Sequence, residues 1–110
     1  MNRAPQRDEV WLVSLDPTHG AEIKKTRPCQ VVSPNEMNRR LQTVIVAPLT
    51  TTIRSYPTRV PLRFQGKSGQ AALDQLRAVD KRRLVKKLGM VSTTAAQQSS
   101  EVLLEMFSRP

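Results

Sequence analysis

The alternation of short apolar runs with polar turn sequences limits what this chain can fold into more than any other feature. Each run is about five to seven residues long and rich in β-branched residues, which is typical of strands and too short for most helices. Proline, glycine, aspartate and serine lie between the runs and favour turns. The runs predict strands over residues 9–15, 29–33, 43–49, 58–64 and 70–76.

The chain ends in a segment with helical periodicity. A capping-box spacing at 94–97 precedes apolar residues that fall on one face of a helix. Short helical turns are expected at 35–40, capped by Asn35, and at 80–84, whereas 86–91 favours no element. We therefore predict a mainly antiparallel sheet or small barrel with a C-terminal helix packed on it. The apolar face of that helix comprises Val102, Leu103, Met106 and Phe107.

The length of 110 residues fits one domain, because a second hydrophobic core would be too small to stand alone. Residues 1–8 are polar and include a proline, which indicates a flexible tail before a single domain over 9–110. Hydrophobic residues make up 38% of the chain and aromatic residues only 4%, so the expected core is modest. A homodimer would stabilise such a core by covering further apolar surface.

The formal net charge of +9 favours a polyanionic partner, either nucleic acid or an acidic protein. A solvated basic surface that only maintains solubility is the alternative explanation. The basic residues are clustered at Lys24, Lys25 and Arg27, at Arg39 and Arg40, and between positions 81 and 87.

The chain contains a single cysteine, Cys29, so the sequence predicts no internal disulfide and no Cys-rich zinc site. We expect neither a structural metal nor a cofactor. No apolar run approaches the roughly 20 residues of a membrane-spanning helix, and the N-terminus lacks the apolar stretch of a signal peptide. These features predict a cytoplasmic protein.

RNA can be cut without a metal ion when its own 2′-hydroxyl attacks the adjacent phosphorus. The protein then has to accept a proton and stabilise negative charge on the phosphoryl oxygens. Glu22 and Arg27 supply a carboxylate and a guanidinium after the first predicted strand, and Thr50 and Thr51 supply hydroxyls after the third. On spacing alone, an ordinary solvated loop and a threonine-rich turn are the commoner explanation of these residues.

A series of longer motifs is more specific than any of these residues alone. They are VWLVSLDPT at 10–18, GAE at 20–22, TRP at 26–28, VVSP at 31–34, VAPLTT at 46–51, YP at 56–57 and LDQLR at 73–77. In this order the motifs resemble the MazF/PemK (Kid-like) family of type II toxins, and the resemblance covers roughly residues 7–107.

The resemblance implies an SH3-like small barrel of antiparallel strands with a C-terminal α-helix, of the CcdB/MazF type. It implies a homodimeric mRNA interferase, a metal-independent and sequence-selective endoribonuclease that cleaves single-stranded mRNA. The expected products carry a 2′,3′-cyclic phosphate and a 5′-hydroxyl. The expected inhibitor is a MazE-like antitoxin whose acidic tail competes with RNA for the basic groove.

The resemblance also implies roles for individual residues. Arg27 matches the arginine that stabilises the phosphate and donates a proton. Glu22 matches a nearby acidic residue that is implicated as the base in some members of the family, and Thr50 matches a hydroxyl residue near the scissile phosphate. The residues expected to bind RNA are Thr51, Lys24, Lys25, Tyr56, Asp74, Gln75 and Arg77, with Tyr56 as a base-stacking side chain.

Two positions depart from the Kid-like branch of the family. That branch has a histidine before the residue matching Glu22 and an arginine two residues before the one matching Asp74, where this chain has Ala21 and Ala72. The His–Arg–Asp set of that branch is therefore absent, and we expect the arginine and threonine version of the site. His19 is expected to be an incidental exposed loop residue.

Two alternative functions are open at this stage. CcdB toxins share the expected fold and poison DNA gyrase, but they depend on a C-terminal Trp-Gly-Ile, whereas this chain ends Phe-Ser-Arg-Pro. A non-catalytic RNA-binding module would explain the charge but not the combination of Glu22, Arg27 and Thr50.

Overall fold

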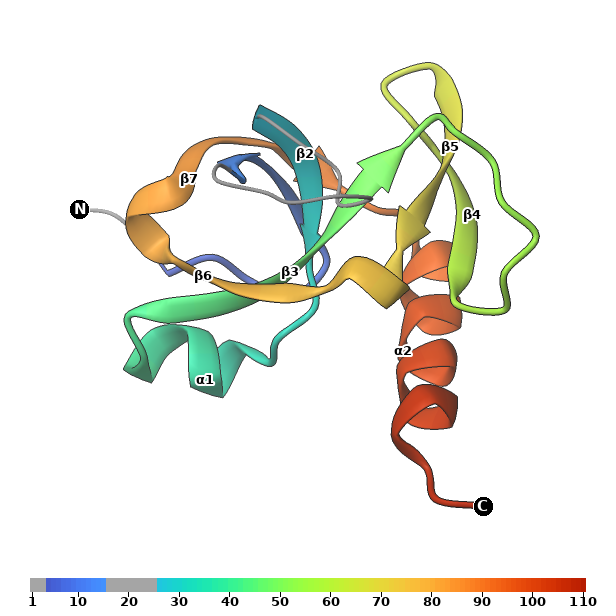
Figure 1. Cartoon of the computed structure of the whole chain (residues 1–110). Helices are drawn as coiled ribbons and strands as arrows, with labels where there is room; N and C mark the ends of the chain where they lie inside the picture. The colour runs from blue at the N-terminus through green and yellow to red at the C-terminus, as the bar shows by residue number, and fades with distance from the viewer. Residues whose placement is uncertain (1–3, 16–25) are drawn as a thin grey trace.

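Figure 1 shows the computed structural model, which describes residues 4–15 and 26–110. Its strands are β1 (Glu9–Ser14), β2 (Thr26–Val31), β3 (Thr43–Thr50), β4 (Arg59–Phe64), β5 (Lys67–Ala72), β6 (Arg77–Asp80) and β7 (Leu84–Met90). Its helices are α1 (Asn35–Arg40) and α2 (Thr93–Phe107), and two 3-10 turns are η1 (Leu73–Gln75) and η2 (Lys81–Arg83). The prediction of a mainly β fold with a C-terminal helix is confirmed.

Strand β3 is the one around which the antiparallel sheet is organised. One side of β3 pairs with β2, and the sheet continues from there through β1 to β7. The other side pairs with β6 along residues 43–46 and with β5 at Leu49 and Thr50, and β4 lies outside β5 as an edge strand. This edge position fits Pro61, which has no N–H to donate. The sheet curls into a half-barrel, and the β4–β5 hairpin stands beside it next to α2 (Figure 1).

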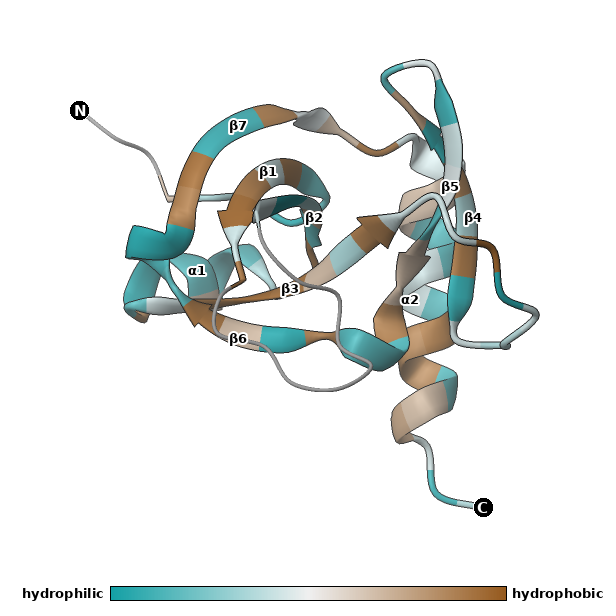
Figure 2. Cartoon of the chain, turned by 45° about the horizontal axis from the view of Figure 1, so that its top comes forward, coloured by the Kyte–Doolittle hydropathy of each residue, from teal (hydrophilic) through white to brown (hydrophobic). Residues whose placement is uncertain are grey.

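Two apolar cores hold these parts together. One lies inside the half-barrel, and the other fills the space between the hairpin, β3 and α2. Figure 2 shows the hydrophobic colouring on parts of β1 and β3, which contribute residues to both cores. Fully buried residues of the first core include Val13, Val31, Val44 and Val46, and those of the second include Val10, Ala47, Ala71 and Leu73. The second core is the one that fixes the hairpin against the end of β3.

Strand β2 begins three residues earlier than predicted, at Thr26 rather than at Cys29. Residues 26–28 pair with residues 12–14 of β1. The extension was not visible in the sequence pattern, because two polar residues and Pro28 come before the apolar run. The correction matters for the site, because it places Arg27 in the sheet rather than in a loop.

The predictions were also wrong in the last third of the sheet. The single strand expected over 70–76 is β5 followed by η1, and β6 then continues along the same strand β3. Strand β7 was not predicted at all. It is an edge strand paired with β1, and its middle residues, including Val85 and Lys86, are exposed, so it has no apolar periodicity. The predicted helical turn near 80–84 is present as η2.

Helix α2 begins one residue before the predicted capping box. The hydroxyl oxygen of Ser92 accepts a hydrogen bond from the Ala95 N–H at 3.1 Å, so Ser92 is the N-cap. Val102, Leu103 and Met106 pack against the second core, whereas Phe107 is exposed. No helix in the described part of the chain is long and apolar enough to cross a membrane.

The N-terminal segment contacts the domain at the residues that the structure describes, 4–8, and the flexible tail over 1–8 stays a prediction. The Asp8 N–H donates to the Val31 carbonyl oxygen at 2.8 Å. The Arg7 N–H donates to Oδ1 of Asn35 at 2.7 Å. The predicted capping role of Asn35 in α1 is therefore wrong, because its side chain binds this segment and Pro34 occupies the N-cap position.

Candidate functional site

Arg27 is held by the pairing of β2 with β1. It is the second residue of β2 and lies opposite Val13, so the ladder fixes the position of its backbone. The Arg27 side chain is exposed, whereas Cys29, two residues further along, is fully buried. A guanidinium on a rigid strand with its head at the surface is well placed to bind an anion.

Thr50 and Thr51 lie where β3 ends. Thr50 pairs with Gln70 of β5, which fixes its backbone, and its Oγ1 accepts a hydrogen bond from the Thr52 N–H at 3.1 Å. Because a hydroxyl is both acceptor and donor, this bond leaves the Thr50 hydroxyl hydrogen available to donate. The chain thereby presents a hydroxyl donor at a defined point of the sheet.

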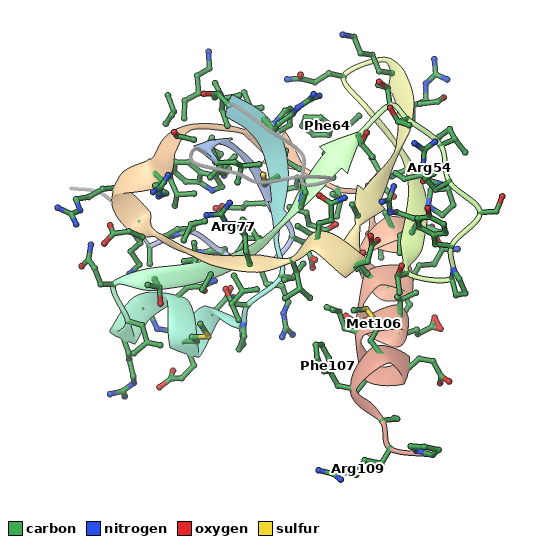
Figure 3. The ribbon with its side chains drawn as sticks, in the orientation of Figure 1. Arg54, Phe64, Arg77, Met106, Phe107 and Arg109 are labelled. Carbon is green, nitrogen blue, oxygen red and sulfur yellow. The ribbon has the colours of Figure 1, made fainter. Side chains whose placement is uncertain are left out.

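These residues meet at one cavity of about 270 Å³ between β2, the end of β3 and the β4–β5 hairpin. Its described lining contains two cations, Arg27 and Lys67, and no acidic residue. Phe64, which Figure 3 places close to the end of β3, adds an apolar surface. The lining residues are Arg27, Pro28, Leu49, Thr50, Thr51, Leu62, Phe64, Gln65, Lys67, Ser68, Gly69 and Gln70. Cations, hydroxyls and an apolar wall together suit a phosphate with an attached base.

Gly69 is needed in β5 because the strand passes close to the backbone of Thr50. A Cβ at position 69 would collide with the Thr50 carbonyl oxygen and lie 3.2 Å from its carbonyl carbon. We expect Gly69→Ala to lower the free energy of unfolding by about 1–3 kcal/mol through overpacking, as measured by urea denaturation. Ser68→Ala, at the exposed neighbouring position, is the control and should change it little. Equal stability of the two variants would contradict this close approach.

A second polar cluster lies at the start of β4. Arg59 pairs with Ala72 of β5, and its guanidinium forms two hydrogen bonds to Asp74, from Nε to Oδ1 at 2.7 Å and from Nη2 to Oδ2 at 3.1 Å. The Arg59 side chain is only 6% exposed. Its hydrogen bond lowers the pKa of Asp74, so this carboxyl is held ionised. The guanidinium also lies 5.1 Å from the centre of the Tyr56 ring.

Other features of the described residues lack such a combination of groups. A larger cavity, about 470 Å³, lies along α2, but its described lining has one cation, Arg7, beside Asp8, and no threonine. Burial raises the pKa of the Cys29 thiol to about 12, which makes it a poor nucleophile. No group of three or more His, Cys, Asp or Glu residues in the described ranges is placed to hold a metal ion.

Comparison with known proteins gives a family match over most of the chain. The family described as "PemK-like, MazF-like toxin of type II toxin-antitoxin system" matches residues 6–107. The chain belongs to the PemK/MazF toxin family.

Relatives of known structure or function support the assignment along the whole chain. Endoribonuclease MazF9 of Mycobacterium tuberculosis is 32% identical over 108 residues, which cover 89% of this chain and 92% of the relative. A mycobacterial endoribonuclease solved in complex with its cognate antitoxin has a TM-score of 0.80 at 26% identity, covering 97% of this chain and all (100%) of that one. MazF of Deinococcus radiodurans has a TM-score of 0.83 at 24% identity, covering 96% and 97%, and shares the fold.

The structure brings only some of the residues that match the PemK/MazF motifs to one place. Arg27, Thr50 and Thr51 line the same cavity. Asp74 and Tyr56 instead surround Arg59, which lies opposite Ala72, the position where the Kid-like branch has an arginine. Arg59 of β4 therefore has its guanidinium on Asp74, opposite a position of β5 that carries only a methyl group.

The remaining motif residues lie elsewhere. Arg77 lies within the half-barrel, where its Nη1 donates to the Leu15 carbonyl oxygen at 3.0 Å (Figure 3). Gln75 ends η1, and neither residue lines the cavity. The predicted site residues Glu22, Lys24 and Lys25, together with His19 and Ala21, lie outside the described residues. The roles of all these residues toward RNA stay predictions.

Three residues around the cavity and its neighbouring cluster were not singled out from the sequence. Lys67 and Gln70 line the cavity, and Arg59 holds Asp74. Their positions depend on the pairing of β4, β5 and β3, which no local motif encodes. The one available signal was the Gly-Lys-Ser-Gly turn at 66–69, which places a lysine at the tip of a hairpin.

Proposed function

We propose that this chain is an endoribonuclease toxin that cleaves single-stranded mRNA in a sequence-selective way. One observation carries the proposal: Arg27, Thr50 and Thr51 line the same cavity, and its described lining has two cations and no acidic residue. Membership of the PemK/MazF toxin family and the endoribonuclease activity named for its relative support it.

The proposed reaction uses a nucleophile that is already in the substrate. Glu22 takes the proton of the ribose 2′-hydroxyl, the 2′-oxygen bonds to the adjacent phosphorus, and the bond from phosphorus to the 5′-oxygen breaks. Arg27 stabilises the negative charge that develops on the phosphoryl oxygens, and the hydroxyl of Thr50 or Thr51 donates to one of them. The resemblance implies that Arg27 donates the proton that the leaving 5′-oxygen receives. We depart from that role, because a guanidinium is a poor acid at neutral pH, and assign this proton to solvent water. The products are a 2′,3′-cyclic phosphate and a 5′-hydroxyl.

We further infer that the chain acts in the cytoplasm as a homodimer and is inhibited by an antitoxin with an acidic tail. The net charge of +9 suits such a tail, and a solved relative was obtained in complex with its cognate antitoxin. An acidic segment would compete with RNA for Arg27 and Lys67, since both ligands are polyanions.

Incubation of the purified protein with a mixed-sequence RNA in excess chelator tests the activity. Cleavage of the single strand, and not of the same sequence in a duplex, is the expected result. Binding of the single strand without any cleavage would instead favour the non-catalytic RNA-binding module. Cleavage that stops when the chelator is added would contradict the proposed chemistry.

A further inference from the structure

The segment between β3 and β4, residues 51–58, runs along the outside of the fold next to the cavity, and we call it the 51–58 arm (Figure 1). It pairs with no described strand, yet it carries two large exposed side chains. Ile53 is 60% exposed and Tyr56 is 51% exposed. Its first residue, Thr51, lines the cavity, so the arm begins at the candidate site.

Gln70 holds the middle of the 51–58 arm with both ends of its amide. Its Oε1 accepts from the Arg54 N–H at 3.0 Å, and its Nε2 donates to the Arg54 carbonyl oxygen at 3.0 Å. The Gln70 side chain thereby pairs with the arm as a neighbouring strand would. Gln70 is only 7% exposed, so few competing water contacts are open to it. Arg54 itself lies on the outer side of the hairpin (Figure 3).

The far end of the 51–58 arm is held by the cluster around Arg59. The Arg59 N–H donates to the Tyr56 carbonyl oxygen at 3.0 Å, and the Thr58 hydroxyl donates to Oδ1 of Asp74 at 3.1 Å. The ion pair between Arg59 and Asp74 fixes both partners. The arm is therefore fixed at its middle and at its end, and its exposed side chains have defined positions.

Gln70 of β5 links the arm to the candidate site because it binds the arm and also lines the cavity. Its backbone pairs with Thr50, its side chain binds Arg54, and it lines the cavity that also holds Arg27. Movement of the arm at Arg54 relative to Thr50 has to break the two bonds of the Gln70 amide.

We propose that Gln70 is a positioning residue that sets the RNA sequence preference by holding the 51–58 arm, whose Ile53 and Tyr56 contact bases next to the scissile phosphate. The inference rests on the proposed function. Contacts to phosphate carry no sequence information, so Arg27 cannot select bases, whereas apolar and aromatic side chains can contact and stack on them. Because the arm is already ordered before RNA binds, binding does not have to supply the entropic cost of ordering it, and preferred bases are distinguished more strongly from other bases.

Three variants test the proposal, with cleavage sites mapped along a mixed-sequence single-stranded RNA. Gln70→Leu has a similar size and removes both hydrogen bonds to the arm without adding charge. Ile53→Ala alters only an exposed side chain and should not affect folding. The control is Asn38→Ala, which also removes a buried side-chain amide. The Asn38 amide donates to the Ser33 carbonyl oxygen in the α1 region, away from the hairpin.

For Gln70→Leu and Ile53→Ala we expect the ratio of cleavage at preferred over other sites to fall by roughly tenfold, the discrimination that one small apolar contact to a substrate provides. KM at the preferred site should rise more than kcat falls. Asn38→Ala should keep the wild-type ratio even where its stability drops. An unchanged ratio in Gln70→Leu would overturn the inference while leaving the nuclease function intact. A wild-type protein that cleaves no RNA would overturn the proposed function itself, and the inference with it.

Discussion

Replacement of Arg27 by alanine is expected to slow RNA cleavage by about 10²–10³, equivalent to roughly 2.7–4 kcal/mol of lost transition-state stabilisation. The estimate rests on the loss of one preorganised donor to a developing phosphoryl charge. Folding should change little, because the Arg27 side chain is exposed and its backbone pairing with Val13 remains. The measurement is the single-turnover cleavage rate, with circular dichroism to check the fold.

Two comparisons make the Arg27 result specific. Arg27→Lys keeps the charge but loses the planar fork, so it should recover only part of the rate. His19→Ala should cost little, since the sequence predicts an incidental loop histidine. Near-normal cleavage by a folded Arg27→Ala, together with a large loss of cleavage in His19→Ala, would show that the catalytic role belongs to His19 and not to Arg27.

The affinity for single-stranded RNA is expected to fall steeply with salt. Each phosphate neutralised on a single strand contributes about −0.7 to the slope of log affinity against log salt, so roughly five contacts lower the affinity about 10²-fold between about 50 and 200 mM. The net charge of +9 and the two cations of the cavity motivate this prediction. A noncleavable all-2′-deoxy strand in a titration by fluorescence anisotropy provides the measurement. An affinity that does not change over this range would mean that the basic residues are only solvated.

The fold was predictable wherever apolar residues recur with a clear period. The C-terminal helix has such a period, the first and third strands are continuous apolar runs, and the structure has α2, β1 and β3 at these places. Strand β7 was not predictable, because an edge strand with exposed charged residues buries too few side chains to leave a period. The start of β2 was missed because Pro28 resembles a strand terminator, although the pairing with β1 tolerates it.

The candidate site was only partly predictable for a related reason. Arg27 and Thr50 belong to local motifs, so their types and spacing were visible in the sequence. Gln70 and Arg59 act across strands, one against the 51–58 arm and the other against Asp74, and their partners are 15 or 16 residues away in the sequence. The register of β4, β5 and β3 decides these contacts, and no local motif encodes it. In particular, the sequence showed that Ala72 lacks a guanidinium but not that Arg59 lies opposite it.

The central claim is that the 2′-hydroxyl of the substrate is the nucleophile, and a single modified RNA tests it most directly. The wild-type protein is incubated with a single-stranded RNA and with the same strand carrying one 2′-deoxy nucleotide 5′ to the mapped scissile phosphate. We predict that the unmodified strand gives a 2′,3′-cyclic phosphate and a 5′-hydroxyl at that site, and that the modified strand is not cut there. Cleavage of the modified strand at the same position, with a 5′-phosphate on the product, would contradict the account.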